Sequence, residues 1–186
     1  MLAWELSNEP NYFPGFFADA TNYSHKMKPF AKAIKAADPS AQIALFASDA
    51  GHQNTSWDDA LAAYAPRYWD LITYHQYPSA LNNVTDTPTL MSLLNDVLVN
   101  NTSSYVTSQI VPRFGTMPVI IAEFDPSTGS GTYGLASTLY GGAWAAEYAL
   151  RLSSSGQVKR VGMHQLVTAS GIELTDNHLT EVDRVD

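Results

Sequence analysis

Short apolar runs alternate with longer amphipathic stretches along the chain. The runs over residues 71–74 and 118–122 contain β-branched and aromatic residues, which are typical of buried strands. The pattern predicts five strands, over residues 3–6, 42–47, 71–74, 118–122 and 160–166. It also predicts five helices, over residues 23–37, 57–64, 89–99, 105–114 and 138–154.

Local signals mark the ends of the first and last predicted helices. Thr21 and Asn22 can cap the first helix at its start. Asp38 before Pro39 closes it, because the residue before a proline avoids the helical region. The polar segment 153–156, which includes a glycine, ends the last helix.

Strands that alternate with helices indicate βαβ units and a parallel α/β sheet. Five strands fit a doubly wound open sheet. They also fit part of a barrel, which needs eight strands and about 250 residues when complete, whereas this chain has 186. No internal repeat or linker is visible, so we expect one domain over residues 1–186.

Net charge, the lengths of the apolar runs and the absence of Cys limit the kinds of partner and site that are expected. The net charge of −8 disfavours nucleic acid, since phosphate binding needs clustered cations. No apolar run approaches the roughly 20 residues that cross a bilayer, and residues 1–5 lack the features of a signal peptide. The absence of Cys excludes disulfides and thiolate metal sites.

Asparagine sequons bear on the cellular compartment. Five Asn-X-Ser/Thr sites occur, at Asn22, Asn54, Asn83, Asn100 and Asn101. Such sites are N-glycosylation acceptors in secreted proteins, so the sequence favours a secreted glycoprotein. The alternative interpretation is a chain that is simply rich in Ser, Thr and polar loops.

Polar clusters follow three of the predicted strands. They lie at residues 7–11, 75–78 and 123–126. In parallel α/β proteins, ligand-binding groups gather at the carboxyl ends of the strands. Two of the clusters carry a glutamate, Glu9 and Glu123. Two carboxylates at different strand ends suit the cleavage of a glycosidic bond, in which one donates a proton and the other attacks the anomeric carbon.

These clusters resemble the motifs of clan A, the large group of retaining barrel glycosidases. The segment 4–11, Trp-Glu-Leu-Ser-Asn-Glu-Pro-Asn, resembles the strand-four motif of the clan. The resemblance implies that Glu9 is the acid/base and that Asn8 binds the sugar 2-hydroxyl. His75 and Tyr77 are similar to the strand-six His-x-Tyr pair, whose Tyr touches the nucleophile. The segment that ends at Glu123 resembles strand seven, which implies that Glu123 is the nucleophile.

The resemblance covers nearly the whole chain and implies its fold. It corresponds to strands four to eight of a (β/α)8 barrel, so strands one to three are expected to be lacking. Within the clan, the motifs are most similar to glycoside hydrolase family seventy-nine, the heparanase and β-glucuronidase family. That family binds a uronic acid partly through a Tyr-Gly segment, for which Tyr133 and Gly134 are the candidates. Tyr133 lies ten residues past Glu123, farther than the family pattern.

The implied function is hydrolysis of O-glycosidic bonds with retention, through a covalent glycosyl-enzyme, and β-glucuronidase activity is one candidate. The expected ligand is a carbohydrate. No metal-ligand spacing is present, so neither a metal nor a cofactor is expected. The main alternative is a carbohydrate-binding or inactive fragment without turnover. A third possibility is an open α/β-sheet enzyme of another class, but the sequence contains neither a nucleophile elbow nor a Walker loop.

Each candidate residue also has a structural interpretation. Glu9 could favour a helix start and Glu123 could be a strand-end charge. Glu5 is expected to be a structural ion-pair partner within its strand, and Asp125 a turn residue. His52 and His164, which also follow apolar runs, could contact substrate or only support the structure.

Overall fold

The fold is built on one parallel sheet of five strands. The computed structural model describes residues 3–48, 54–77, 84–124, 139–153, 156–163, 174–175 and 178–179. The strands are β1 (Ala3–Glu5), β2 (Gln42–Phe46), β3 (Leu71–Gln76), β4 (Val119–Phe124) and β5 (Val158–Met163). Their spatial order is β1-β2-β3-β4-β5, and each pairs in parallel with the next. Two two-residue strands, β6 (Leu174–Thr175) and β7 (His178–Leu179), form a separate antiparallel pair.

Helices connect each strand of the sheet to the next. They are η1 (Pro10–Tyr12), α1 (Ala20–Ala37), α2 (Thr55–Ala63), α3 (Thr87–Asp96), η3 (Val97–Ser103), η4 (Val106–Ile110), α4 (Val111–Phe114) and α5 (Leu139–Ser153). No helix in the described part of the chain is long and apolar enough to cross a membrane.

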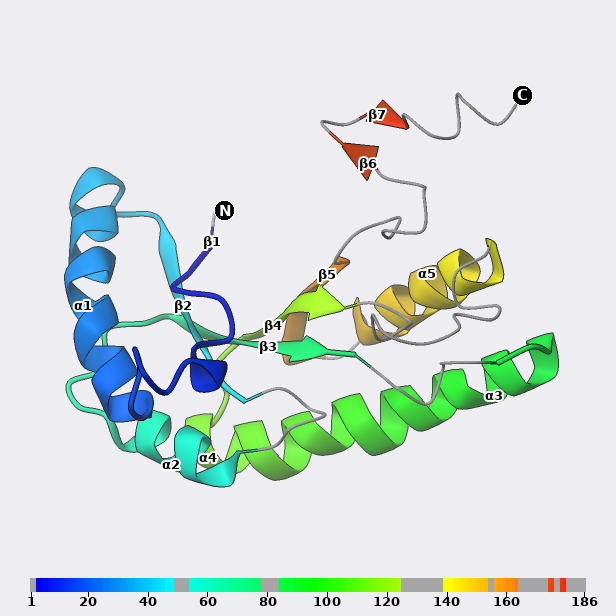
Figure 1. Cartoon of the computed structure of the whole chain (residues 1–186), viewed down its shortest axis with the longest axis horizontal. Helices are drawn as coiled ribbons and strands as arrows, with labels where there is room; N and C mark the ends of the chain where they lie inside the picture. Colours follow the sequence, from blue (N-terminus) through cyan, green and yellow to red (C-terminus); the bar gives the residue numbers. More distant parts are fainter. Residues whose placement is uncertain are drawn as a thin grey trace.

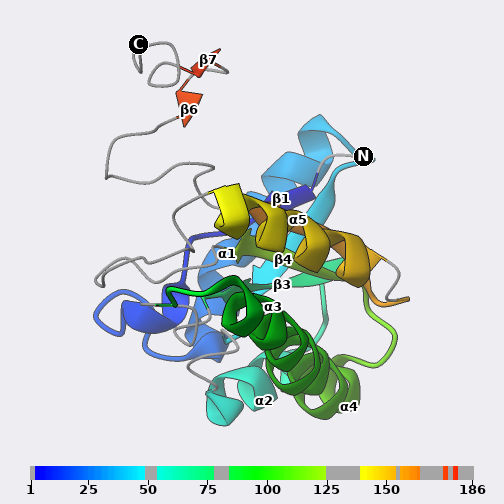
Figure 2. The same cartoon turned by 90° about the vertical axis from the view of Figure 1, so that its right-hand side faces the viewer.

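The strand order determines on which face the helices lie. Each crossover joins a strand to its immediate neighbour and the direction never reverses. Because parallel crossovers are almost always right-handed, a sheet wound in one direction places all its helices on the same face. Figures 1 and 2 show α1, α2, α3, α4 and α5 on one side of the curved sheet. The chain is therefore a half-barrel, as predicted, and not a doubly wound sheet.

The helix starts differ slightly from those predicted. Asp19, rather than Thr21 or Asn22, caps α1: its side chain accepts a hydrogen bond of 2.7 Å from the Asn22 backbone N–H. Asn54 and Asp86 cap α2 and α3 in the same way. Each of these side chains satisfies an N–H that has no partner within its helix.

The two helices predicted over residues 89–99 and 105–114 are one continuous helical stretch. Residues 87–114 stay helical through η3 and η4, which have the wider π-type pattern. The polar segment 100–104 predicted a break. Instead, Thr102 is fully buried and its hydroxyl lies 2.6 Å from the Tyr148 hydroxyl on α5. Packing against α5 therefore outweighs the weak helix propensity of this segment.

Aromatic side chains fill the space between the sheet and its helices. On α5, Trp144 and Tyr148 stack on each other at 5.3 Å, and Tyr148 stacks on Phe124 of β4 at 4.5 Å. On α1, the Tyr23 hydroxyl donates to the Leu6 carbonyl at 2.5 Å and accepts from the Phe46 N–H at 3.2 Å. Tyr23 thus fixes the ends of β1 and β2 relative to each other.

A buried polar cluster joins the end of β2 to the helices beneath it. Asp58 of α2 accepts hydrogen bonds from the Ser48 backbone N–H and hydroxyl, each at 2.8 Å. The Tyr105 hydroxyl donates to the Ser48 carbonyl and also reaches Asp58. Burial raises the pKa of Asp58 even though these hydrogen bonds act in the opposite direction.

Candidate active site

The first glutamate of the site lies in a tight turn after β1. Ser7 and Glu9 both have left-handed backbone conformations, with φ of 76° and 42°. Such values are uncommon outside glycine and often accompany functional sites. Pro10 then begins η1, and the Tyr12 N–H donates to the Glu9 carbonyl at 3.0 Å. This turn holds Glu9 at the carboxyl edge of the sheet.

A register shift places His75 of β3 next to Glu123 of β4. Tyr74 pairs with Ile121, but His75 pairs with Glu123, so Ala122 is the extra residue of a bulge. Ile120 and Ala122 line the inner face of the sheet together with Thr73. Strict alternation would therefore turn Glu123 away from that face. The bulge instead brings Glu123 beside His75, which is consistent with the tendency of bulges to redirect side chains near active sites.

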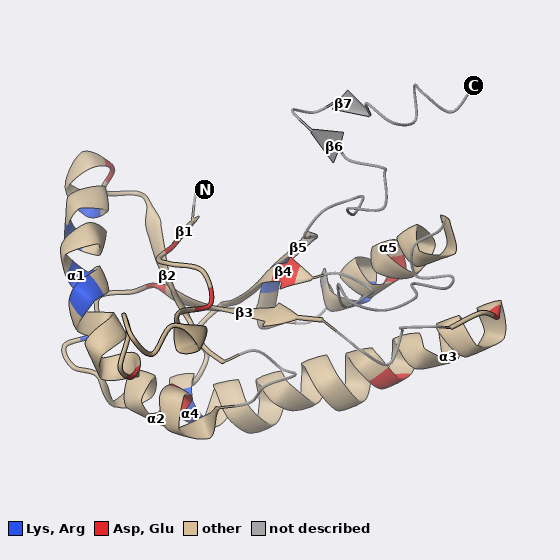
Figure 3. Ribbon diagram, viewed as in Figure 1, with Lys and Arg blue, Asp and Glu red and all other residues tan. Residues whose placement is uncertain are grey.

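Four of the predicted catalytic and binding residues, Glu9, His75, Tyr77 and Glu123, lie together and are joined by hydrogen bonds and ion pairs. His75 Nδ1 lies 2.8 Å from Glu9 Oε1 and 3.4 Å from Glu123 Oε2. The Tyr77 hydroxyl donates to Glu123 Oε2 at 2.7 Å. One oxygen of each glutamate and a His75 nitrogen all lie within 4.8 Å of one another. Figure 3 shows acidic positions on both β1 and β4, the strands that lead to the site.

His75 is the buried centre of this group. Its side chain is 1% exposed, against 28% for Glu9 and 24% for Glu123. Burial by itself would lower the pKa of His75, but the interactions with Glu5 and Glu9 and the charge of Glu123 outweigh it and raise the pKa above 6.5. The geometry therefore favours an imidazolium between carboxylates.

The raised pKa of His75 opposes metal binding, because a metal ion must displace its proton. Glu9, His75 and Glu123 offer donor atoms close enough to surround a small cation. A histidine binds a metal only in its neutral form, whereas this environment favours the protonated form. In the described residues, the His75 nitrogen that such an ion would need makes a hydrogen bond with Glu9.

Other sequence candidates are placed only in part. Asn8 is exposed directly before Glu9, so its amide is accessible, and its role in sugar binding stays a prediction. Tyr133, His52, His164 and Asp125 lie outside the described residues. Glu5 was expected to be an ion-pair partner, and the structure identifies the partner: Glu5 Oε1 lies 3.6 Å from His75 Nε2.

The sequence analysis did not single out the aromatic loop that follows Glu9. Tyr12, Phe13 and Phe16 are 45%, 55% and 61% exposed. The loop is fixed by Lys26, whose ammonium binds the Phe16 carbonyl and lies 4.3 Å from the centre of the Phe16 ring. The close spacing of these aromatic residues could have been read from the sequence, whereas their exposure, which is typical of ligand-binding patches, is seen only in the structure.

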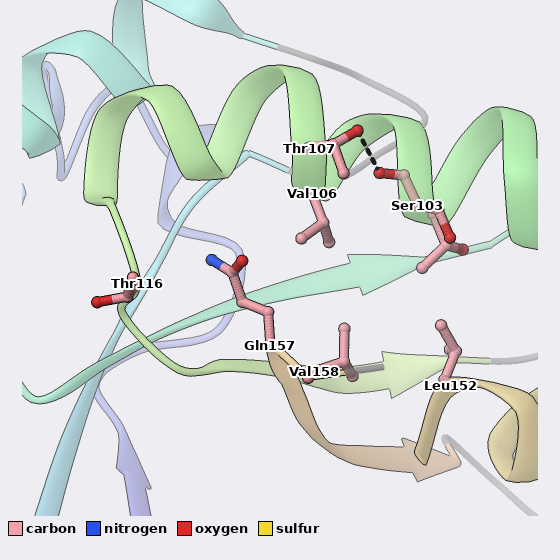
Figure 4. Close-up of a pocket in the computed structure, with 9 residues that line it drawn as sticks. Ser103, Val106, Thr107, Thr116, Leu152, Gln157 and Val158 are labelled. Atoms are coloured by element: carbon pink, nitrogen blue, oxygen red, sulfur yellow. Dashed lines mark hydrogen bonds between the residues drawn. The ribbon is translucent and has the colours of Figure 1, made fainter. Parts of the chain in front are cut away.

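Among the described residues, one cavity lies on the inner face of the sheet next to this site and another lies away from it. A cavity of about 260 Å³ on the inner face is lined by Glu5, Thr73, Arg160 and Gly162, among others. A larger one of about 470 Å³ lies between the long helix and the start of β5, where Ser103, Thr107 and Gln157 face it (Figure 4). The larger cavity is at the amino ends of the strands. In barrels, that end serves stability rather than catalysis.

Comparisons with known proteins agree at the level of the fold. No family model matches the sequence, and no curated protein matches it. A Paenibacillus polymyxa xyloglucanase of glycoside hydrolase family 44 has a similar structure, with a TM-score of 0.60 and 15% identity over 89% of this chain. An α-L-arabinofuranosidase from Thermotoga maritima has a TM-score of 0.58 and 20% identity, also over 89%. The chain covers only 42% and 34% of these two enzymes.

Proposed function

We propose that this chain is part of a retaining glycoside hydrolase in which Glu9 is the acid/base and Glu123 is the nucleophile. The observation that carries the proposal is their separation, since one carboxylate oxygen of each lies within 4.8 Å of the other. Retaining enzymes place the two carboxyl groups about 5–5.5 Å apart, and inverting enzymes about 6.5–9.5 Å. The short distance leaves no room for a water molecule between Glu123 and the anomeric carbon.

The contacts of the two glutamates fit different roles. Tyr77 donates a hydrogen bond to Glu123 Oε2, which orients the carboxylate and leaves Oε1 to attack the anomeric carbon. Glu9 in its protonated form gives its proton to the leaving oxygen as the glycosidic bond breaks. In the second step, Glu9 removes a proton from water, and that water releases the sugar from Glu123.

The fold and the surroundings of the site support the same proposal. Both glutamates lie at the carboxyl edge of a half-barrel sheet, where barrel enzymes carry their active sites. The similar structures are glycosidases with this fold. The exposed rings of Tyr12, Phe13 and Phe16 can pack against the apolar face of a sugar ring.

For the substrate class we propose β-glucuronides, on the basis of the motif around Glu9 and the His-x-Tyr pair. The purified chain should be assayed on a panel of aryl glycosides: β-glucuronide, α-L-arabinofuranoside and β-cellobioside. Preferential hydrolysis of the glucuronide is expected. A preference for one of the other two would contradict the substrate class and leave the mechanism intact.

Azide rescue tests the two catalytic roles. In Glu9→Ala, the nucleophile remains, and azide can attack the glycosyl-enzyme without a base, so the product should be a glycosyl azide of retained configuration. In Glu123→Ala, azide replaces the nucleophile and should give the inverted product. Proton NMR of the two products is the measurement. The same configuration from both variants would mean that the roles are wrong.

The alternative is carbohydrate binding without turnover. The exposed rings of Tyr12, Phe13 and Phe16 beside Glu9 would serve binding alone as well as catalysis. Binding of a glucuronic-acid-containing oligosaccharide, measured by calorimetry, with no hydrolysis of any aryl glycoside would favour this alternative over catalysis.

We also propose that the protein is a secreted glycoprotein. The Asn54 sequon is exposed, and the helix cap uses only its Oδ1 atom, which accepts from the Trp57 N–H at 3.1 Å. Its Nδ2 atom, to which a glycan would be attached, is not used by that cap. Secretion from a eukaryotic host should give a product whose mass falls on treatment with an N-glycanase. An unchanged mass would refute glycosylation in that host.

A further inference from the structure

The carboxylate of Glu5 lies behind His75, on the side away from the two proposed catalytic glutamates. Glu5 Oε1 is 3.6 Å from His75 Nε2, whereas the other ring nitrogen, Nδ1, contacts Glu9 and Glu123. Among the described residues, neither Glu5 Oε1 nor His75 Nε2 has a hydrogen-bond partner, and both atoms are buried. An unpaired buried polar atom is costly, so these two atoms satisfy each other electrostatically.

The other neighbours of His75 hold its ring in this orientation. The Phe46 ring of β2 packs edge-on against the imidazole at 4.8 Å, and the Tyr77 ring lies at 6.5 Å. The ionisable groups around the imidazole are Glu5 from β1, Glu9 from the following turn, Glu123 from β4 and Tyr77 after β3. The neighbour from β2 carries no charge. The imidazole therefore bridges one carboxylate on its Nε2 side and two on its Nδ1 side.

We propose that Glu5 is a positioning residue that holds His75 as an imidazolium with its Nδ1–H directed at Glu9. Its role in catalysis rests on the function proposed above. When Glu9 gives its proton to the leaving oxygen, it becomes a carboxylate beside this cation, which stabilises it. When Glu9 later takes a proton from water, the imidazolium keeps its own protons. His75 is thus unchanged over the cycle, and Glu5 acts only through it.

The charges explain why Glu5 is needed for this state. Burial disfavours a charged imidazole, and only nearby anions can reverse that effect. Glu9 must be neutral to act as the acid, so at that stage it contributes no negative charge. Glu123 loses its charge when it bonds to the sugar. In the described contacts Glu5 touches neither the proposed nucleophile nor the proposed acid, so its carboxylate takes part in neither chemical step. The raised pKa of His75 agrees with this arrangement.

The first test is an NMR titration of the histidine rings in the whole chain. In Glu5→Gln, which keeps the size of the side chain, we expect the His75 midpoint to move to lower pH. His25, which lies on α1 against Tyr64, should titrate as in the wild type. Glu147→Gln removes a carboxylate from the exposed face of α5 and should leave His75 unchanged. An unchanged His75 midpoint in Glu5→Gln would overturn the proposal.

Glu5→Asp provides a second variant if Glu5→Gln does not fold by circular dichroism. It keeps the charge but withdraws it by one methylene, so the His75 midpoint should move to lower pH by less than the removal of the charge would cause. No movement would again overturn the proposal. In activity assays, Glu5→Gln should shift the alkaline limb of kcat/KM to lower pH with little change in KM. If the wild-type chain hydrolyses nothing, the proposed function fails, while the titration still decides the role of Glu5.

Discussion

His75 has a consequence for stability that does not depend on catalysis. Its pKa in the folded protein is raised above 6.5, so folding favours the protonated form. The stabilisation is fully present below about pH 6.5, the unfolded value, and is lost as the pH rises through the folded pKa. We expect the free energy of unfolding, measured in urea, to fall over this range. His75→Gln should show a flatter profile, and an equal fall in both proteins would show that another group is responsible.

Asp58 has a pH effect on stability of the same sign, although the form favoured by folding is neutral rather than charged. Its pKa is raised in the folded state, so the folded protein binds this proton more tightly than the unfolded chain does. Stability should therefore fall as the pH rises from about 3.8, the unfolded value, through the folded pKa. Asp58→Asn should remove this fall and keep the contacts to Ser48. Asp58→Ala should cost about 1–3 kcal/mol, because it leaves the buried Ser48 groups unpaired.

Denaturant titrations of these variants from pH 4 to pH 7 measure the effect. If Asp58→Asn were as unstable as Asp58→Ala, the charge itself would be needed and the interpretation would be wrong. Arg113 supplies a compatible positive charge nearby, and it is already paired with Asp59 at 2.7 Å.

The residues of the site could be predicted from the sequence, but not all the contacts between them. The motifs around Glu9, His75 and Glu123 predicted that these side chains meet at one edge of the sheet, and the structure brings them together. The contact between Glu5 and His75 could not be predicted from the sequence. Which strand residues lie next to each other on one side of the sheet depends on the register in which the strands pair. The catalytic roles of these residues remain predictions.

At the scale of elements, the pairing of β4 with β5 depends on a glycine. A side chain added at Gly162 would collide with the carbonyl oxygen of Ala122, the residue at the β4 bulge. We expect Gly162→Ala to cost about 1–3 kcal/mol, as for overpacked sites, and to reduce activity by moving Glu123. Gly142→Ala is the matched control. It lies exposed in α5 with free space around it and should gain about 0.5–1 kcal/mol.

Thermal unfolding and kcat of both variants provide the measurement. Equal stability of Gly162→Ala and the wild type would show that the two strands separate easily at this point.

The bulge could not be predicted from the sequence. Strict alternation along the strand places the Glu123 side chain on the outer side of the sheet, and the extra residue of the bulge places it on the inner side. The continuous helix over residues 87–114 could not be predicted either, since its polar middle is stabilised by contacts with α5 that lie far away in sequence.

At the scale of the whole molecule, the sheet formed by the described residues has β1 and β5 as its outer strands. In the described part of the chain, β1 and β5 each pair on one side only. Trp4 on β1 is 46% exposed, and such an edge favours self-association. Trp4→Lys should weaken association by at least about tenfold, which corresponds to about 1.4 kcal/mol. Sedimentation velocity over a range of concentrations measures it.

Phe30→Lys is the control for this prediction. Phe30 is 60% exposed on the outer surface of α1, away from the edge backbone of β1. If Phe30→Lys reduced self-association and Trp4→Lys did not, the contact would be made by the helical surface. The half-barrel itself could be predicted from the alternation of strands and helices, together with the motif order. The separate β6–β7 pair could not, because two-residue strands leave no periodic pattern.

The monotonic strand order also affects how the protein can be made. Each strand of the sheet after β1 pairs with the strand that precedes it in the sequence. No later strand is inserted between two earlier ones. A chain that emerges from the ribosome can therefore add one βα unit at a time to a growing sheet. Each pairing still joins residues that lie far apart in the sequence, such as Ile72 with Val119, and non-local parallel pairing of this kind forms slowly. Synthesis and assembly can nevertheless proceed in the same direction, from β1 to β5.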